Sequence, residues 1–255
     1  GVRQGVDLIM IETMNDSYET KAAVLAAKEN CNLPIFVTNV YDETHKLMTG
    51  ADPLAMVSML EGLKVDALGL NCSLGPAEMK DIVKELISYS SIPVIVKPNA
   101  GLPTVVNGET VFNVTPEDFA AEMFEIAKMG ANVLGGCCGT NPEYIRALSE
   151  KIKSAEYKAP REKDITVVSS YTHGVIFGEK PVLIGERINP TGKKRFKQAL
   201  IENDMSYILN EGIRQEEAGV DILDVNVGLP EIDEADFMER TVAELGAVTD
   251  LPLQI

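Results

Sequence analysis

The sequence predicts an α/β protein of the (β/α)₈-barrel type, in which two successive barrels are each only partly present. Short, almost continuously apolar segments alternate with longer amphipathic segments, as in a parallel sheet covered by helices. The spacing of this alternation is close to the roughly 31 residues per unit of a complete barrel. The pattern stops after residue 153 and starts again at residue 181, which predicts a second barrel after an interruption.

Residues 1–153 contain five strand–helix units. Asp52 followed by Pro53 is a typical helix start, and Thr115 with Asp118 has the spacing of a capping box. A barrel needs eight units, and the first residues resemble the end of a helix, so we expect the chain to begin inside a barrel. The predicted strands are 6–12, 34–40, 65–71, 92–98 and 131–136, and the predicted helices are 16–30, 52–63, 75–89, 115–130 and 140–153.

Residues 154–180 are charged and mixed in pattern, which predicts a linker. The strand–helix pattern then resumes, so residues 181–255 are predicted to form the opening part of a second barrel. Its elements are expected at 181–186 (strand), 204–219 (helix), 220–226 (strand), 234–248 (helix) and 251–255 (the start of a strand).

The composition disfavours several classes of partner. Asp and Glu number 39 against 23 Lys and Arg, and the resulting formal net charge of −16 disfavours binding to nucleic acid or to an anionic membrane. The sequence has no apolar run of the roughly 20 residues that cross a bilayer, and no signal-peptide pattern. With four cysteines and no export signal, we expect reduced thiols and a cytoplasmic location.

Several candidate functional side chains follow predicted strands of the first barrel. In barrels of this type, reactive residues stand at the C-terminal ends of the strands. Three of the four cysteines occupy such positions, and two of them are consecutive. Consecutive Cα atoms are only about 3.8 Å apart, too close for a relaxed disulfide. The residues at this rim are Glu12, Cys72, Asn99, Cys137 and Cys138.

Cys72, Cys137 and Cys138 could converge on one Zn²⁺ ion. A catalytic zinc site uses three protein ligands and keeps a fourth position open for water or substrate. Gly135 and Gly136 allow the tight bend that two successive ligands need, and the helix that follows favours thiolates through its dipole. Three thiolates on Zn²⁺ leave about one negative charge, which suits a substrate thiol bound as thiolate better than hydrolysis.

Spacing alone leaves other interpretations open. The three rim cysteines can also be packing residues or redox sensors, and Cys31 is expected to be a small buried residue. Glu12 and Asn99 can be ordinary loop caps. The two histidines, His45 and His173, are expected in solvated loops.

Five stretches of the sequence are similar to one known family. "GLNCSLGP" (69–76), "VKPNAG" (96–101) and "GGCCGTNPEYI" (135–145) resemble the homocysteine-binding barrel of the cobalamin-dependent methionine synthase family, the 5-methyltetrahydrofolate–homocysteine methyltransferases. "IGERINPTGKKRF" (184–196) and "DILDVNVG" (221–228) resemble the start of that family's pterin-binding barrel. The resemblance covers five units of the first barrel and the opening of the second.

The resemblance implies a role for each matched residue. Cys72, Cys137 and Cys138 would hold zinc, the open position would take the sulfur of homocysteine, and Glu12 and Asn99 would hold the amino acid end of that substrate. The implied reaction is methyl transfer from 5-methyltetrahydrofolate, by way of cobalamin, to zinc-activated homocysteine thiolate, giving methionine. Residues matching positions around methyltetrahydrofolate in the second barrel are Glu186, Asn189, Gly192, Lys193, Lys194 and Asn226.

The sequence also departs from the family pattern. It ends before the aspartate that the family places on the third pterin strand, just beyond residues 251–255, to hold the pterin ring, and it contains no cobalamin-binding module. We therefore expect the chain to be a piece of an enzyme that is inactive alone and that meets cobalamin on a module of the same enzyme.

Three alternative functions stay open. One is a cobalamin-independent zinc-thiolate homocysteine S-methyltransferase with a betaine or sulfonium donor, against which the pterin-like residues 181–255 argue. Another is a corrinoid methyltransferase with a different thiol acceptor. The third is a non-catalytic structural zinc module, which a histidine as the fourth ligand would favour.

Overall fold

The computed structural model describes residues 2–106, 108–178 and 180–255, and the chain divides into two compact units, residues 1–164 and 165–255. The boundary between the units falls within the segment predicted as a linker. The prediction of an α/β protein with parallel strands is confirmed in both units. In the described residues each parallel sheet is open, and neither closes into a barrel.

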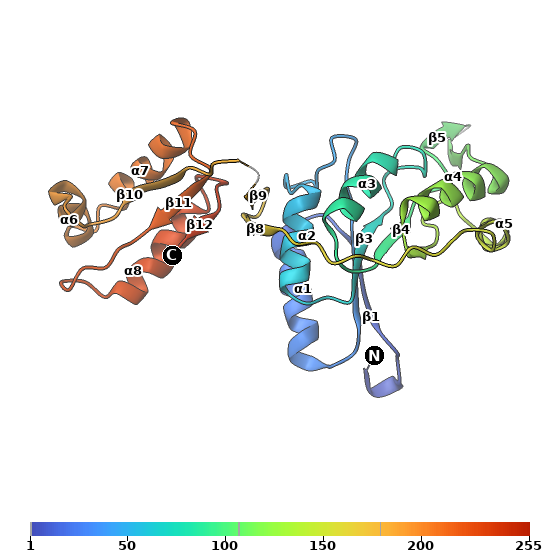
Figure 1. Cartoon of the computed structure of the whole chain (residues 1–255), viewed down its shortest axis with the longest axis horizontal. Helices are drawn as coiled ribbons and strands as arrows, with labels where there is room; N and C mark the ends of the chain where they lie inside the picture. Colours follow the sequence, from blue (N-terminus) through green and yellow to red (C-terminus); the bar gives the residue numbers. More distant parts are fainter. Residues whose placement is uncertain (1, 107, 179) are drawn as a thin grey trace. The chain divides into compact units, whose positions relative to one another are not determined.

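The first unit is built on a five-stranded parallel sheet in the order β1-β2-β3-β4-β7, in which neighbouring strands follow the order of the chain (Figure 1). Each connection between these strands contains a helix, as expected for barrel units. The strands are β1 (Ile9–Met14), β2 (Ile35–Asn39), β3 (Ala67–Asn71), β4 (Val94–Lys97) and β7 (Val133–Leu134). The helices are α1 (Ser17–Asn30), α2 (Pro53–Gly62), α3 (Lys80–Tyr89), α4 (Pro116–Met129) and α5 (Pro142–Ile152), after a short 3₁₀ helix η1 (Val2–Gln4).

The helix starts of this unit follow the cap signals in the sequence. The side chain of Asp52 accepts a hydrogen bond from the backbone N–H of Ala55 at the start of α2, and Thr115 caps α4 in the same way through Asp118. Asn141 caps α5 and directs the helix N-terminus back towards the loop that follows β7. These caps satisfy backbone donors that a helix leaves without partners.

The two faces of the sheet differ in chemistry. One face carries apolar side chains of the core, such as Leu68, Leu70 and Val96, which pack against residues of the helices. The register pairs Asn71 of β3 with Lys97 of β4, so these two side chains point to the opposite face. That face also carries the buried Ile95, so its polar groups Asn71 and Lys97 are confined to the C-terminal ends of β3 and β4, where the unit can present functional groups.

One region of the first unit differs from the sequence-based prediction. The segment after β4, which was expected to be a loop, contains an antiparallel hairpin of β5 (Pro103–Val106) and β6 (Glu109–Phe112). The ring of Phe112 covers the turn at Gly139, where an added Cβ would lie 2.4 Å from the ring. The hairpin thus packs directly on the loop that carries the consecutive cysteines.

The second unit contains an antiparallel hairpin and a three-stranded parallel sheet in the order β10-β11-β12. The hairpin, β8 (Thr166–Ser169) and β9 (Gly174–Phe177), lies within the segment that was predicted as a linker. The sheet strands are β10 (Ile184–Ile188), β11 (Ile222–Val225) and β12 (Leu253–Gln254), and the helices are α6 (Lys194–Ile201), α7 (Met205–Glu217) and α8 (Glu234–Leu245). Helix α6 was not predicted. No helix in the described part of the chain is both long enough and apolar enough to span a membrane.

Candidate metal centre

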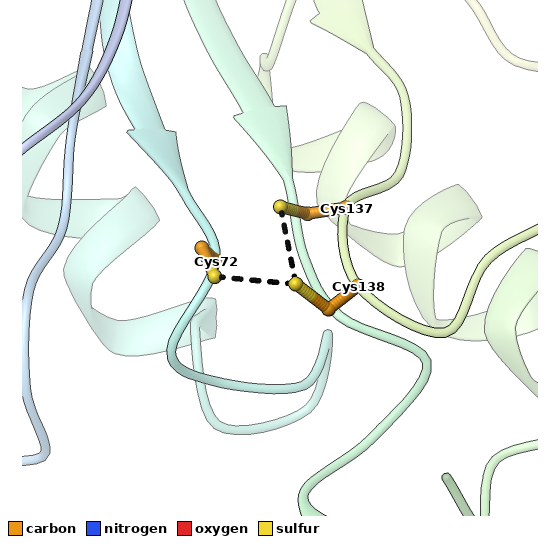
Figure 2. Close-up of side chains that lie close together, drawn as sticks. All are labelled: Cys72, Cys137 and Cys138. Atoms are coloured by element: carbon orange, nitrogen blue, oxygen red, sulfur yellow. Dashed lines mark hydrogen bonds between the residues drawn. The ribbon is translucent and has the colours of Figure 1, made fainter. Parts of the chain in front are cut away.

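Three cysteine side chains from two loops meet at the C-terminal edge of the first sheet (Figure 2). Cys72 follows β3 directly, and Cys137 and Cys138 lie in the loop that follows β7. Strand β4 lies between these two strands in the sheet, so the two loops emerge at the same edge. The structure therefore brings together the three cysteines that the sequence placed at one rim.

The distances between the sulfur atoms fit a tetrahedral metal site. Cys72 Sγ lies 3.7 Å from Cys138 Sγ, and Cys137 Sγ lies 4.0 Å from Cys138 Sγ. Tetrahedral zinc with Zn–S bonds of about 2.3 Å needs sulfur atoms about 3.8 Å apart. All four cysteines of the chain are free thiols. The donor set and its spacing thus fit a zinc ion, and all three ligating atoms lie within 4.8 Å of one another.

In the described residues, neither histidine belongs to this cluster. His45 Nδ1 lies 2.6 Å from Glu85 Oε1, and His173 in the second unit lies beside Thr172 and Asp250. The cluster that the structure describes contains three possible ligands, all of them cysteines. This arrangement suits a site with one position for an exogenous ligand better than a closed structural site.

The backbone around the rim is strained. Cys72 and Ser73 have φ angles of 62° and 64°, and Thr13 at the end of β1 has a φ angle of 64°. Positive φ is uncommon for residues other than glycine, and for a β-branched residue such as threonine it is a clear outlier. Strained residues persist where the surrounding structure holds them, and they concentrate at functional sites.

Asn99 holds the two cysteine loops together. It is 4% exposed, its Oδ1 accepts a hydrogen bond of 3.0 Å from the backbone N–H of Cys138, and its own N–H donates to Leu74 in the loop after Cys72. The backbone N–H of Cys137 donates to the carbonyl of Pro98 at 2.8 Å. The structure therefore places the Asn99 side chain against the backbone of the cysteine loop, where both its amide oxygen and its backbone N–H are already hydrogen-bonded.

Asn71 is a rim residue that sequence reasoning missed. It is 1% exposed, and its Oδ1 accepts hydrogen bonds from the Thr13 backbone N–H and the Thr38 hydroxyl. Its Nδ2 donates to Thr13 Oγ1 at 2.8 Å and to Cys137 Sγ at 3.7 Å. A single amide thus joins β1, β2 and β3 to the cysteine loop. The available sequence signal was its position directly before Cys72 at a strand end.

We expect the substitution Asn71→Asp to lower the zinc affinity of the protein about 10- to 100-fold, as removal of outer-shell partners typically does. The change replaces the N–H group that faces Cys137 with a carboxylate oxygen, which repels a thiolate. Competition with a chromophoric chelator measures the affinity. Thr38→Val removes only the hydroxyl donor to Asn71 and is expected to retain zinc; an Asn71→Asp variant with native affinity would contradict the prediction.

The surroundings of Cys138 favour its protonated thiol form. The hydrogen bond with Cys72, followed by burial and the neighbouring Cys137, raises the pKa of the Cys138 thiol to about 11. Adjacent thiolates repel one another, so the protonated form is favoured when the sulfurs have only each other as neighbours. A metal ion reverses this preference because it coordinates deprotonated sulfur.

Glu12 lies within β1, two residues before its end, and not after the strand as the sequence predicted; its carboxylate is paired. Its Oε2 forms an ion pair of 2.8 Å with Nζ of Lys97, and the two side chains are 45% and 17% exposed, respectively. The sequence interpretation assigned a role to Glu12 and none to Lys97. The structure therefore adds a basic residue to the rim.

The residues of the second unit that the resemblance singled out lie within β10 (Glu186) or after β10 and β11. Glu186 pairs with Lys193, whose Nζ lies 2.9 Å from Oε1. Asn189 and Asn226 accept hydrogen bonds from the backbone N–H groups of Thr191 and Gly228 in their own loops. The backbone N–H of Asn226 also donates to the carbonyl of Ile188, which holds the ends of the two strands together.

The remaining two residues of this group are Gly192, in the turn after β10, and Lys194, at the start of α6. Gly192 has a φ angle of 72°, so the turn needs glycine there, and Lys194 is the exposed first residue of α6. Glu186 thus lies within β10, Lys194 begins α6, and the other four residues lie in the loops that follow β10 and β11. Their roles towards a ligand stay a prediction.

Comparison with known proteins gives the following matches. The sequence model of one family, described as homocysteine S-methyltransferase, matches residues 1–152. The chain is 33% identical over 264 residues to methionine synthase of Mycobacterium leprae and 33% identical over 261 residues to methionine synthase of Mycobacterium tuberculosis. Each alignment covers 98% of this chain and 22% of the relative, so the chain spans about a fifth of their length.

A solved structure supports the fold assignment. The crystal structure of the homocysteine methyltransferase MmuM from Escherichia coli, in its oxidized form, aligns with a TM-score of 0.50 and 24% sequence identity. The alignment covers 59% of this chain and 47% of that chain. At this identity the likeness concerns the fold alone.

Proposed function

Because this chain belongs to the homocysteine S-methyltransferase family, we propose that Cys72, Cys137 and Cys138 bind one zinc ion and activate the thiol of homocysteine for methylation. The single observation that carries this proposal is the spacing of the three sulfur atoms: Cys138 Sγ lies 3.7 Å from Cys72 Sγ and 4.0 Å from Cys137 Sγ. That spacing suits three of the four positions of a tetrahedral site. The fourth position is proposed for the homocysteine sulfur.

When bound, zinc would lower the pKa of the substrate thiol and make the thiolate nucleophile available at neutral pH. The protein itself supplies orientation. Asn99 and Asn71 fix the two cysteine loops, and the strained backbone at Cys72 aims its sulfur towards Cys138. Holding the acceptor sulfur in one place converts the transfer into a reaction between positioned groups, which lowers its entropic cost.

We propose further that the methyl group comes from 5-methyltetrahydrofolate by way of cobalamin, and that the product is methionine. The support is the extent of the sequence similarity: the family model ends at residue 152, whereas the similarity to methionine synthases covers 98% of the chain. On this proposal, Glu186, Lys193 and Asn226 belong to a folate-binding edge in the second unit, and a cobalamin-binding module of the same enzyme approaches both barrels.

The cobalamin-independent alternative, with a betaine or sulfonium donor, needs only the first unit. It gives no reason for the similarity across residues 165–255. The structural-zinc alternative needs a fourth protein ligand, and both histidines have other partners. A cytoplasmic location is also proposed, because metal-binding thiols must stay reduced.

We expect the zinc K-edge X-ray absorption spectrum of the zinc-loaded protein to change from three sulfur neighbours to four when homocysteine is added. Zinc content per chain is measured on the same samples. Serine, which lacks a thiol, serves as the control ligand and should leave the sulfur count unchanged. A protein that binds no zinc, or whose sulfur count does not respond to homocysteine, would argue against the proposed function.

A further inference from the structure

We propose that Lys97 and Glu12 together recognise the amino acid end of the thiol substrate, Glu12 through its α-ammonium group and Lys97 through its α-carboxylate group. This inference rests on the proposed function. The new element is Lys97, which neither the resemblance nor the rim pattern singled out. It makes the site selective for thiols that are zwitterionic amino acids.

Lys97 lies between the two cysteine loops. Its backbone carbonyl accepts a hydrogen bond of 3.1 Å from the N–H of Cys72. Its aliphatic stem runs along Gly135, two residues before Cys137: a Cβ added to Gly135 would lie 3.2 Å from Cγ of Lys97. The absence of a side chain at Gly135 therefore leaves room for the stem of Lys97 at the base of the loop.

The side chain of Lys97 points to the face on which the sulfurs lie. Lys97 is the register partner of Asn71, so both side chains leave the sheet on the same side, and the Asn71 amide reaches Cys137 Sγ at 3.7 Å. Glu12 directly precedes Thr13, which accepts a hydrogen bond from the same amide. Glu12 is thus adjacent to a residue that contacts the Asn71 amide, and Lys97 lies beside Asn71 in the sheet.

The Glu12–Lys97 pair has the charges that an amino acid zwitterion needs. The two charged groups lie 2.8 Å apart and both remain partly exposed, so solvent reaches them and their mutual attraction is weak. A bound amino acid exchanges one pair for two: its ammonium group replaces Lys97 on Glu12, and the released Lys97 pairs with its carboxylate. Charge-assisted hydrogen bonds of this kind are among the stronger ones in proteins.

The negative charge of the site favours a positively charged residue at position 97. Three thiolates around Zn²⁺ carry about one net negative charge, and the chain carries a formal net charge of −16. A substrate that carries a thiolate and a carboxylate is repelled both by the zinc–thiolate site and by the net charge of the chain. The ammonium group of Lys97, on the same side of the sheet as Asn71, offsets the charge of the carboxylate. A thiol without a carboxylate gains nothing from this ammonium group.

The test is calorimetric binding of three thiols to the zinc-loaded protein: L-homocysteine, 3-aminopropane-1-thiol, which lacks the carboxylate, and 4-mercaptobutanoate, which lacks the ammonium group. Lys97→Met is expected to weaken binding of homocysteine and 4-mercaptobutanoate about 10- to 100-fold, the usual range for a hydrogen bond to a charged group. Binding of 3-aminopropane-1-thiol is expected to stay the same or strengthen, because Glu12 is released. Glu12→Gln should show the reverse selectivity between the two analogues.

Two variants serve as controls. Lys128→Met removes another lysine–glutamate pair, with Glu125 on α4, and should change none of the three affinities. Lys97→Arg keeps the positive charge and should retain most of the preference for carboxylate-bearing thiols. If Lys97→Met weakened all three thiols by one factor, Lys97 would be a structural residue of the rim and the inference would be wrong, while the proposed function would stand. If the native zinc-loaded protein bound none of the thiols, the proposed function itself would fail.

Discussion

Replacing Cys72, Cys137 or Cys138 with alanine is expected to lower the zinc affinity of the protein roughly 100-fold or more. The same change is expected to abolish binding of homocysteine to the zinc through its thiolate sulfur. Zinc binding by four protein ligands in small domains amounts to about 10–16 kcal/mol, or roughly 3 kcal/mol per ligand. Each 1.4 kcal/mol corresponds to a factor of ten in affinity. A site with only three protein ligands loses more zinc affinity on removal of one ligand than a four-ligand site does, because only two ligands remain.

Cys31→Ala is the matched control for this prediction. Cys31 caps the end of α1, where its Sγ contacts the carbonyl of Ala27 at 3.3 Å, and it lies outside the cluster of three. We expect this variant to retain zinc with native affinity. Zinc content after gel filtration and competition with a chromophoric chelator measure both variants. Native affinity in any of the three rim variants, or loss of zinc in Cys31→Ala, would contradict the assignment.

The sequence was sufficient to predict the sheet of the first unit and the common edge at which the three cysteines lie. Strands such as β3 and β4 are short apolar runs between helices with clear caps, and such runs predict parallel strands independently of distant residues. Cys72, Cys137 and Cys138 all follow strands, and the ends of parallel strands share an edge. The fold class therefore predicts one common edge for the three cysteines, whereas the short distances between their sulfur atoms come from the structure.

The partners of these cysteines could not be predicted in the same way. The hydrogen bonds of Asn71 join residues 58 and 66 positions apart, and the ion pair of Glu12 with Lys97 joins residues 85 positions apart. Both depend on strand register and on the positive φ at Thr13, neither of which leaves a local pattern in the sequence. For the same reason, the resemblance assigned Glu12 a ligand role without its basic partner.

Local sequence features account for the two elements that the sequence analysis did not predict, the β5–β6 hairpin and helix α6. The β5–β6 hairpin does carry a local sequence signal, because Asn-Gly at positions 107–108 is a dipeptide typical of two-residue hairpin turns. Helix α6 carries little signal: its N-cap residue, Lys193, makes no side-chain capping bond, and its first turn contains no acidic residue. Basic residues at a helix start oppose the helix dipole, so the pattern there did not predict a helix.

Gly69→Ala is expected to destabilise the first unit by about 3 kcal/mol or more, at the upper end of the range for overpacked interiors. Gly69 lies in β3, and a Cβ added there would lie 1.9 Å from the backbone carbonyl oxygen of Ile95 in β4. A flexible side chain could move away from such a contact, but a backbone carbonyl within a parallel ladder cannot. The two strands must separate, and Cys72 lies at the end of the strand that moves.

The prediction therefore has two parts that a single set of samples can test. Urea unfolding followed by circular dichroism should show a lower midpoint for Gly69→Ala, and the remaining folded protein should bind zinc less tightly, because separation of β3 from β4 moves Cys72 away from Cys138. Gly62→Ala is the matched control, since Gly62 is the last residue of α2 and no atom lies within 4 Å of an added Cβ. It should unfold at the native midpoint or slightly above it, because alanine has less freedom than glycine in the unfolded chain. A native midpoint for Gly69→Ala would mean that β3 and β4 can accommodate a methyl group where the register places the Ile95 carbonyl, and the geometry derived for the cysteine edge would then be wrong.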